Sequence, residues 1–307
     1  MTQENSQQPV NYKPVGERTI DYQYHQLLQK IMDEGKEVGV IHGQKSRKVV
    51  GHELRYDMTN GFPVLTERFL GGTYFSGALG EHIGFLHGAR THEALIGFGC
   101  NWWKKWTNEE KSAKFNLPVG ELGAGSYGVS WTDFPTDDGR KFNQILNFQN
   151  QVKTMPELRT HLISPWIPDA VAAGNPEFPR RTQVAPCHGL IHAHVNSEEK
   201  TVAIVHFQRS ADVPVGLCFN IMQYAAFGMM LAHMLGYKFI ELVHYISDAH
   251  MYEVQYPYVE KLLSQGPKRF GKVDINTSPK DIVDFLPYDF ELLEYESWPE
   301  MKIPTPV

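Results

Sequence analysis

The stretch QRSADVPVGLCFN, residues 208–220, decides how this chain is interpreted. Alternating apolar residues over 201–208 predict a strand before it, and the apolar run 219–235 predicts a helix after it. Within the stretch, the planar fork of an arginine could bind a phosphate, and a hydroxyl and a carboxylate lie close by. The amide of Asn220 can donate to one atom and accept from its neighbour, as the O4 and N3–H of uracil require. An ordinary turn with helix-capping chemistry is the alternative interpretation.

A second chemical feature lies shortly before this stretch, in the sequence APCH, residues 185–188. Cys187 is a candidate nucleophile because positive charge nearby lowers the pKa of a thiol. The alternative is a buried, unreactive side chain. Arg180 and Arg181 precede it, and they either bind phosphate or form a solvated pair in a loop.

The composition of the 307-residue chain is that of a globular protein, with 42% hydrophobic and 21% charged residues. A net charge of -6 gives no basic field that would attract nucleic acid. Three cysteines provide no disulfide framework and fit a reducing compartment. The N-terminal residues lack the apolar core of a signal peptide, and the apolar run 225–235 is too short to span a bilayer. We therefore expect a cytoplasmic protein that binds neither nucleic acid nor a membrane.

Hydrophobic periodicity predicts a mixed α/β (α+β) fold in one domain, residues 18–307, after a flexible N-terminal arm, residues 1–17. The predicted helices cover residues 20–34, 75–87, 140–153, 219–235 and 251–263. The predicted strands cover residues 48–50, 53–57, 190–195, 201–208 and 239–247. Residues 107–125 and 165–186 are expected to be irregular. The sequence contains no clean linker that would predict a second domain.

These motifs resemble those of the thymidylate synthase family, in which QRS-x-D is followed by a glycine and FNI and the active-site cysteine lies in a motif like APCH. Further matches keep the family order over residues 20–307. They are GHELR at 51–55 with NGFP at 60–63, EHIGFLHG at 81–88, a tryptophan pair at 103 and 106, YG-x-x-W at 127–131, D-x-H-x-Y at 248–252, and a closing tail at 301–307.

The resemblance implies a fold and a reaction. The fold would be a three-layer sandwich on a large twisted sheet, paired back-to-back as a homodimer. The thiolate of Cys187 would add to C6 of a pyrimidine nucleoside monophosphate, so that C5 attacks the one-carbon unit of 5,10-methylenetetrahydrofolate. The expected co-substrate is thus a folate, and no metal is expected.

The resemblance also implies a role for each further site residue. Glu81 would transfer protons through water, within a polar network that includes Tyr127 and His188. Asn220 would bind the base. The remaining substrate contacts would be Arg209 and Ser210 at the phosphate, Arg159 of the partner subunit at the same phosphate, and His250 and Tyr252 at the sugar. The folate contacts would be Asp212 at the pterin, Trp103, Trp106 and Gly216 along the wall, and Val307 in the closing tail.

The chain departs from the family pattern at several places. The phosphate-loop arginine of the family falls in the stretch 41–44, which contains none, and Arg47 or Lys45 could substitute for it. Only Arg159 matches the arginine pair that the family donates across the dimer. Other departures are Cys218 in place of a proline, and the segments 123–126 and 189–194 beside the matched motifs.

Two reactions stay open on these grounds. The first is methylation of dUMP to dTMP, favoured by Trp103 and the tail because methylation needs a dry site. The alternative is a pyrimidine nucleotide 5-hydroxymethylase, in which water attacks the methylene group. His192 and His194 alternate on a predicted strand and should share a face, either toward solvent or an interface, or beside a reacting water. A catalytically idle homologue that binds RNA is disfavoured by the intact site motifs and the acidic net charge.

Overall fold

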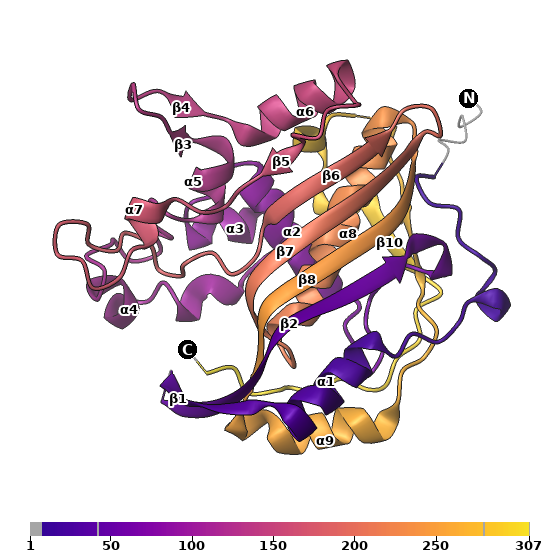
Figure 1. Ribbon diagram of the computed structural model, residues 1–307, viewed down its shortest axis with the longest axis horizontal. Coiled ribbons are helices and arrows are strands. Elements are labelled where there is room, and N and C mark those ends of the chain that lie inside the picture. The colour runs from indigo at the N-terminus through magenta and orange to yellow at the C-terminus, as the bar shows by residue number, and fades with distance from the viewer. Residues whose placement is uncertain (1–7, 42, 279, 307) are drawn as a thin grey trace.

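A six-stranded sheet forms the centre of the molecule (Figure 1). The computed structural model describes residues 8–41, 43–278 and 280–306. The strand order is β1-β2-β8-β7-β6-β5. The bounds are β1 Lys36–Ile41, β2 Gln44–Asp57, β5 Leu162–Ile163, β6 Leu190–Asn196, β7 Thr201–Asp212 and β8 Lys238–Tyr252. Because β7 and β8 pair in parallel, the chain must return across the sheet between them, and α8 makes this crossing.

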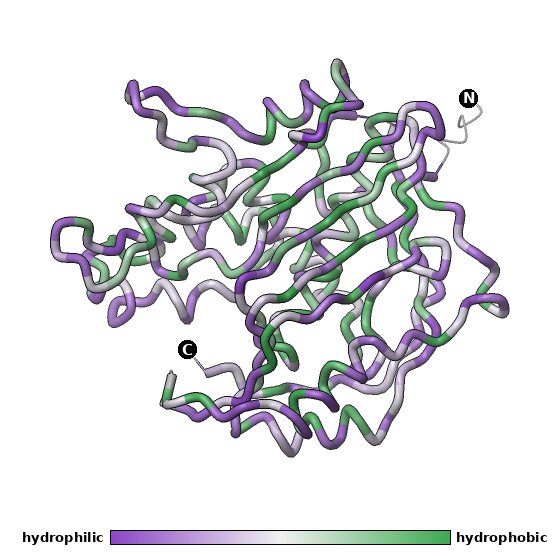
Figure 2. The backbone as a smooth tube through the Cα atoms, in the orientation of Figure 1, coloured by the Kyte–Doolittle hydropathy of each residue, from purple (hydrophilic) through white to green (hydrophobic). Residues whose placement is uncertain are grey.

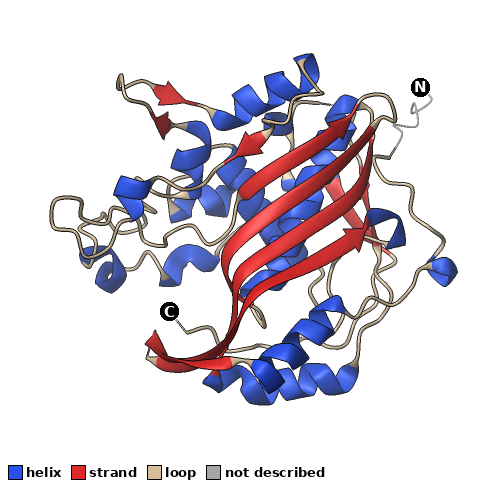
Figure 3. Ribbon diagram, in the orientation of Figure 1, coloured by secondary structure: helices blue, strands red, loops and turns tan. Residues whose placement is uncertain are grey.

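Helix α8 (Gly216–Leu235) covers one face of this sheet, and α2 (Thr73–Leu86) packs against α8 (Figure 3). Helix α8 is apolar on nearly all sides, as expected of a helix enclosed by other elements. It packs closely on β8, since a Cβ at Gly228 would lie 2.3 Å from the ring of Phe239. Figure 2 shows hydrophobic residues recurring along the central strands, with hydrophilic residues frequent in the outer loops.

The remaining elements surround this centre (Figure 1). The other α-helices are α1 Gln23–Glu34, α3 His92–Gly97, α4 Glu109–Ala113, α5 Tyr127–Thr132, α6 Gln144–Thr154, α7 Pro168–Val171 and α9 Tyr256–Gln265. Short 3-10 helices are Val15–Glu17, Met58–Asn60, Trp102–Lys105, Glu253–Gln255, Ile282–Asp284 and Pro287–Asp289. Two small hairpins pair β3 Phe134–Pro135 with β4 Lys141–Phe142, and β9 Lys272–Ile275 with β10 Phe290–Leu293. No helix in the described part of the chain is long and apolar enough to cross a membrane.

The sheet face that points away from α8 carries exposed apolar side chains. Phe207 on β7 and Tyr245 on β8 stack there, with ring centroids 5.7 Å apart. Both residues are more than a third exposed, and Ile240 of β8 is exposed as well. In a single chain, this face therefore leaves aromatic surface in contact with water.

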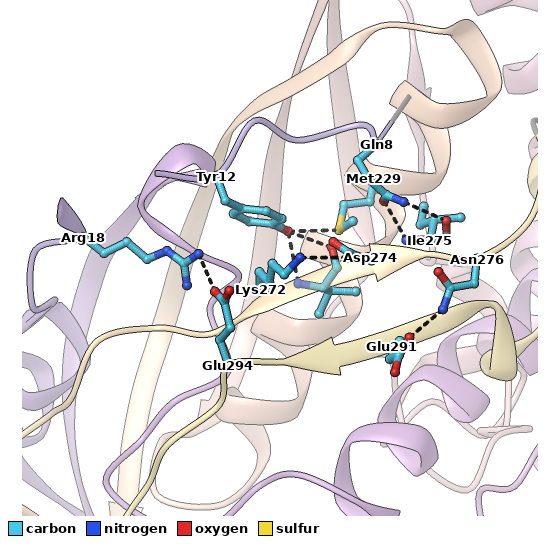
Figure 4. A network of polar contacts seen from close by, with 11 residues as sticks. Gln8, Tyr12, Arg18, Met229, Lys272, Asp274, Ile275, Asn276, Glu291 and Glu294 are labelled. Carbon is cyan, nitrogen blue, oxygen red and sulfur yellow. Dashed lines mark hydrogen bonds and ion pairs between the residues drawn. The ribbon is translucent and has the colours of Figure 1, made fainter. Parts of the chain in front are cut away.

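The segment that follows residue 7 packs firmly on the body of the protein, whereas we predicted a flexible arm over residues 1–17 (Figure 4). Gln8 exchanges two hydrogen bonds with the backbone of Ile275 in β9, at 3.1 and 2.8 Å. The hydroxyl of Tyr12 donates to the carbonyl of Val273 in the same strand, and Val10 is buried. The described part of this segment is thus held by side-chain amide and hydroxyl groups. Residues 1–7 lie outside the described residues.

The mixed α/β fold on a large sheet is confirmed, while several element boundaries were wrong. The stretches 48–50 and 53–57 belong to one strand, β2, in which Gly51 has a φ of 71° and the register with β8 is the same on both sides of it. Strands β7 and β8 both extend further than predicted, to Asp212 and Tyr252. Consequently, most of the signature stretch lies at the end of a strand and the start of a helix, and not in a loop.

Three of the predicted helices began too early: those at 20–34, 140–153 and 251–263 start at Gln23, Gln144 and Tyr256. Those predicted at 75–87 and 219–235 start earlier than expected, at Thr73 and Gly216. Conversely, α4 and α7 occupy parts of the two segments that we expected to be irregular. Both are short helices of five and four residues, so their apolar periodicity covers little more than one turn.

Candidate active site

A cavity of about 910 Å³ opens where β7 and β8 end and α8 begins. Thirteen of the fifteen predicted site residues line it, from all parts of the chain: Glu81, Trp103, Trp106, Tyr127, Cys187, His188, Arg209, Ser210, Asp212, Gly216, Asn220, His250 and Tyr252. Arg159 is exposed and lies outside this wall. Val307 lies outside the described residues. The cavity therefore brings together motifs that are up to 171 residues apart, from Glu81 to Tyr252.

Strand register explains part of this convergence. Ser210 on β7 is paired with Asp248 on β8, and Asp212 is paired with His250. On the other side of β8, Lys48 of β2 is paired with His250. Because alternate residues of a strand point to the same face, these side chains form a row that faces the cavity.

Cys187 lies half-buried in the cavity wall. Its backbone N–H donates to the hydroxyl of Tyr127 at 2.8 Å, and a guanidinium nitrogen of Arg209 lies 3.4 Å from its sulfur. Burial raises the pKa of the Cys187 thiol, while the positive charges of Arg209 and Arg180 act to lower it. Two arginines therefore lie close enough to assist the thiolate, as expected. The effect of burial on the pKa is nevertheless larger than the effect of their charges.

His188 does not supply positive charge to the neighbouring thiol. Desolvation lowers its pKa well below the ordinary value of a histidine, so the ring is neutral. The ring stacks on Tyr127 with centroids 4.4 Å apart, and its Nδ1 lies 2.5 Å from the hydroxyl of Tyr224. His188 thus belongs to the polar network behind the cysteine, with Tyr224 as a partner that the sequence did not suggest.

Three N–H groups converge on the buried carboxylate of Glu81. The indole nitrogens of Trp102 and Trp103 donate to Oε1 at 2.8 and 2.5 Å, and Gln223 donates to Oε2 at 2.6 Å. Burial raises the pKa of Glu81, and these three donors act to lower it. A buried carboxyl with a raised pKa and fixed donors is suited to take up and release protons during a reaction.

Asn220 is held by an amide on each side. Its Oδ1 accepts from Nε2 of Gln208 at 2.8 Å, and its Nδ2 donates to Oε1 of Gln223 at 3.0 Å. One N–H of the Asn220 amide and further acceptor capacity on its oxygen are left for a molecule in the cavity.

A family model described as thymidylate synthase matches residues 22–307, nearly the whole chain. This chain belongs to the thymidylate synthase family. The family's chemistry is folate-dependent transfer of a one-carbon unit to a pyrimidine, with 5,10-methylenetetrahydrofolate as co-substrate. The residues that the resemblance indicated therefore belong to a one-carbon transferase whose motifs meet at one cavity.

The stretch in which a phosphate-binding arginine was expected contributes a different residue to this cavity. Neither predicted substitute for the loop arginine lines the cavity: Arg47 donates to the carbonyl of Met32, and Lys45 is exposed. Lys48 does line it, and its ammonium lies 2.8 Å from the carboxylate of Asp248. The other oxygen of Asp248 lies 2.9 Å from Nδ1 of His250. His42, in the same stretch, lies outside the described residues.

Asp212, the predicted pterin contact, is tied to the C-terminal tail. Gln255 donates to both oxygens of Asp212, at 3.2 and 3.1 Å, and to the carbonyl of Pro304 at 2.9 Å. Desolvation raises the pKa of Asp212 to about 6, against the charge of His250. Arg68 donates to the carbonyl of Met301 at the start of the tail, and residues 301–303, 305 and 306 line the cavity. The tail is thus docked over the site.

The cavity residues that were expected to bind the folate have the chemistry that this co-substrate requires. Asp212 offers acceptors for the N–H edge of a pterin, and tryptophan rings provide flat surface beside it. Cationic side chains of the cavity rim would attract carboxylates: Lys105, Lys111, Lys114 and Arg180. Trp103 was predicted as part of the folate wall, and its indole N–H also holds Glu81.

The histidine pair of β6 is not part of the cavity wall. The rings of His192 and His194 lie on one face with centroids 4.4 Å apart, as the alternation predicted. His192 contacts the carbonyl of Arg159 at 3.2 Å. A role beside the reacting water therefore gains no support, and a solvent or interface position is retained.

Several site residues were not predicted from the sequence: Lys48, Arg68, Trp102, Gln208 and Gln223. A signal existed for two of them. Gln208 opens the signature stretch, and Gln223 follows Asn220 by three residues on a helix, where side chains are neighbours. The two neighbouring arginines have different environments: Arg180 lines the cavity, whereas Arg181 forms an ion pair with Asp169 at the surface.

Proposed function

We propose that this protein methylates dUMP to dTMP, with 5,10-methylenetetrahydrofolate as the source of both the carbon and the hydride. The single observation that carries the proposal is that Cys187, Glu81 and Asn220 face one cavity. A nucleophile, a proton-transfer group and a base-reading amide are the three functions that attack at C6 and substitution at C5 require.

In the first step, the Cys187 thiolate forms a bond to C6 of the pyrimidine. The electron pair of the C5–C6 double bond moves toward C5 and O4, which makes C5 nucleophilic. Arg209, 3.4 Å from the sulfur, stabilises the thiolate before the attack. Tyr127 holds the backbone N–H of Cys187 and so fixes the approach of the sulfur.

Asn220 and Glu81 act on the ring itself. Asn220 donates to O4, where negative charge develops, and accepts from N3–H. Glu81 moves protons at the ring through water, and its three N–H donors keep the carboxylate in one position. After C5 has gained the one-carbon unit, the C5 proton must leave as the bond from that unit to the folate nitrogen breaks. Addition of a hydride to the methylene group left on C5 then restores the C5–C6 double bond as the Cys187 thiolate departs from C6.

When bound, the folate supplies the one-carbon unit and, in methylation, the hydride. The residues of this chain hold it and exclude water: Asp212 accepts from its N–H edge, and the tail closes the cavity through Gln255 and Arg68. Trp102 and Phe219 add a further wall, with ring centroids 5.5 Å apart. This enclosure favours hydride over water as the last reactant, and therefore methylation over hydroxymethylation.

Product analysis tests the proposal. The protein is incubated with 5,10-methylenetetrahydrofolate and with dUMP, UMP or dCMP, and the nucleotides are analysed by mass spectrometry. We expect dTMP from dUMP together with dihydrofolate, which is followed by absorbance. A hydroxymethylated product with tetrahydrofolate released unoxidised overturns the methylation claim and establishes the hydroxymethylase alternative. Product from UMP at the same rate overturns the preference for deoxyribose.

We also propose a back-to-back homodimer through the open sheet face. The stacked Phe207 and Tyr245 give this face an apolar centre that a second copy would bury. Arg159 lies outside the wall of its own cavity and would contribute to the partner's phosphate site. Mixed dimers of Arg159→Ala and Cys187→Ala subunits should then have at most one working site. A fully active monomer in analytical ultracentrifugation contradicts the dimer.

A further inference from the structure

We propose that Gln223 is the specificity-determining residue that holds Asn220 in the orientation for uracil and prevents it from turning toward cytosine. The inference rests on the proposed function, since it concerns the base that the same site reads. Uracil presents an acceptor at O4 and a donor at N3–H, whereas cytosine presents a donor at N4 and an acceptor at N3. A free asparagine amide could turn over and bind either edge.

The orientation of Gln223 is fixed by a backbone carbonyl. Its Nε2 lies 3.1 Å from the carbonyl oxygen of Ala78 and 2.6 Å from Oε2 of Glu81. A carbonyl oxygen can only accept, so the group of Gln223 that faces it must be the NH₂. The oxygen of Gln223 consequently faces Asn220, and the Asn220 atom 3.0 Å away must be its NH₂.

The other side of Asn220 is fixed in the same way. Nε2 of Gln208 lies 3.1 Å from the carbonyl oxygen of Ser210 and 2.8 Å from Oδ1 of Asn220. The oxygen of Gln208 then faces Nε2 of His244 at 2.8 Å, so that nitrogen must carry a proton. Burial lowers the pKa of His244 to about 3, and the ring is therefore the neutral Nε2–H tautomer.

A reversed Asn220 would lose both partners at once. Its NH₂ would face the NH₂ of Gln208, and its oxygen would face the oxygen of Gln223. All three side chains are buried, with exposed fractions of 7% for Asn220, 1% for Gln208 and 0% for Gln223. Each of these buried groups would lose its hydrogen bond without gaining one to water, so the reversed form is strongly disfavoured.

Gln223 also connects base reading with proton transfer. Its amide bridges Asn220 to Glu81, so the chain of donors runs from His244 through Gln208, Asn220 and Gln223 and ends on the Glu81 carboxylate. Reversal of the whole chain is opposed at two points, because the carbonyls of Ala78 and Ser210 cannot donate. Removal of the Gln223 amide frees Asn220 on one side and takes one donor from Glu81.

The test uses Gln223→Met, which keeps the length of the side chain and removes the amide. We measure kcat/KM for dUMP and dCMP, and the dissociation constants of both nucleotides by calorimetry. The ratio of dUMP to dCMP should fall about tenfold or more, because one buried hydrogen bond no longer opposes the reversed amide. The acidic limb of the pH profile with dUMP should also move to higher pH, since Glu81 has lost a donor that lowers its pKa.

His233→Gln is the matched control, because His233 is another buried polar residue of α8 and lies outside the cavity wall. It should leave the ratio unchanged. Equal losses for dUMP and dCMP in Gln223→Met, with the ratio preserved, overturn the inference and assign Gln223 a merely structural role.

A second variant covers the case in which Gln223→Met does not fold. Gln223→Glu has nearly the same shape, but its carboxylate cannot donate to Ala78 or Glu81 unless it is protonated. Selectivity for uracil should therefore decline as pH rises in this variant and stay level in the parent. Level selectivity in both overturns the inference. Binding of dUMP without dTMP formation overturns only the methylation claim, whereas binding of neither nucleotide by the parent overturns the proposed function itself.

Discussion

The two ends of the cavity are built on different physical principles. At the base end, Glu81, Asn220 and Gln223 are buried and satisfy one another through short hydrogen bonds. At the phosphate end, Lys48 and Asp248 are about a third exposed and are joined by an ion pair. Recognition of a base edge depends on which atom donates, and this requires fixed amides. Attraction of a phosphate depends on charge, which acts without a fixed orientation.

The carboxylate of Asp248 stays ionised over a wide pH range. Desolvation acts to raise the pKa of Asp248, but hydrogen bonds from His250 and Lys48 outweigh it and lower the pKa to about 2. Lys48 is paired with His250 across the strands, but its ammonium contacts Asp248. Asp248 is in turn paired with Ser210 of β7. The ion pair thus directs Lys48 toward β7, the strand of Ser210, which is expected to bind the phosphate. We infer that Lys48 replaces the missing loop arginine.

The largest effect is expected between the two ends, at the nucleophile. Cys187→Ser should leave both ends intact, so that dUMP binds with a dissociation constant within about threefold of the parent. Turnover should fall by at least ~10³-fold, because an alcohol provides almost no anion near neutral pH. Calorimetry and dihydrofolate absorbance measure the two quantities. Substantial turnover in this variant excludes covalent attack by Cys187.

A smaller but selective effect is expected at the base end. Asn220→Asp should lower kcat/KM for dUMP by about 10²-fold, since the new carboxylate cannot donate to O4. The same substitution should raise kcat/KM for dCMP. This rise should be larger when Gln223→Met is added, because Oε1 of Gln223 otherwise lies 3.0 Å from an oxygen of the new carboxylate. A double-mutant cycle with both nucleotides measures this coupling. Strict additivity of the two changes would mean that the base end is not one unit.

The effect at the phosphate end should be weaker and sensitive to salt. Lys48→Met should raise KM for dUMP about tenfold at low ionic strength, as expected for the loss of a hydrogen bond to a charged group, and less at 0.5 M salt. Binding of deoxyuridine, which has no phosphate, should not change. Lys45→Met is the matched control, since Lys45 is exposed and does not line the cavity. An equal loss with deoxyuridine would place Lys48 at the sugar.

The smallest effect on activity is expected at Glu67, a buried carboxyl outside the cavity. It is 2% exposed and accepts the backbone N–H of Thr66, and among the described residues it has no cluster of side-chain donors like that of Glu81. Burial raises the pKa of Glu67 from 4.5 to about 7. The folded state thus holds this proton more tightly than the unfolded state, and the parent should lose stability as pH rises from about 4.5 through about 7.

Glu67→Gln should therefore increase the free energy of unfolding at pH 8 by about 1–3 kcal/mol and change it little at pH 4. The uracil preference should stay the same. Urea unfolding at the two pH values gives the comparison. A lower stability at pH 8 would show that Glu67 has a charged partner and that burial alone does not describe it.

Sequence patterns predicted the central fold better than the limits of its strands. The strongly apolar α8 and the alternation over 201–208 were readily recognised, because their side chains pack on the core. The ends of β7 and β8 were missed since Arg209–Asp212 and Asp248–Tyr252 carry polar side chains toward a cavity. Functional residues therefore interrupted the alternation that identifies a strand.

The site was predicted as far as local motifs reach. Cys187 and Asn220 lie in recognisable stretches, whereas the partners that position them are remote in sequence. Gln223 meets Glu81 across 142 residues, and Lys48 meets Asp248 across 200. Such pairs depend on the parallel and antiparallel register of β2, β7 and β8, which no local spacing reveals.

The parallel pairing of β7 with β8 also has a consequence for how the chain folds. Thr201–Asp212 and Lys238–Tyr252 can align only after α8 has crossed the sheet, so closure of this loop precedes formation of their ladder. Ser210 and His250 reach their places in that same event. Recovery of nucleotide binding after dilution from denaturant should therefore follow the slow, topology-limited phase of refolding, and helix formation by circular dichroism should precede it.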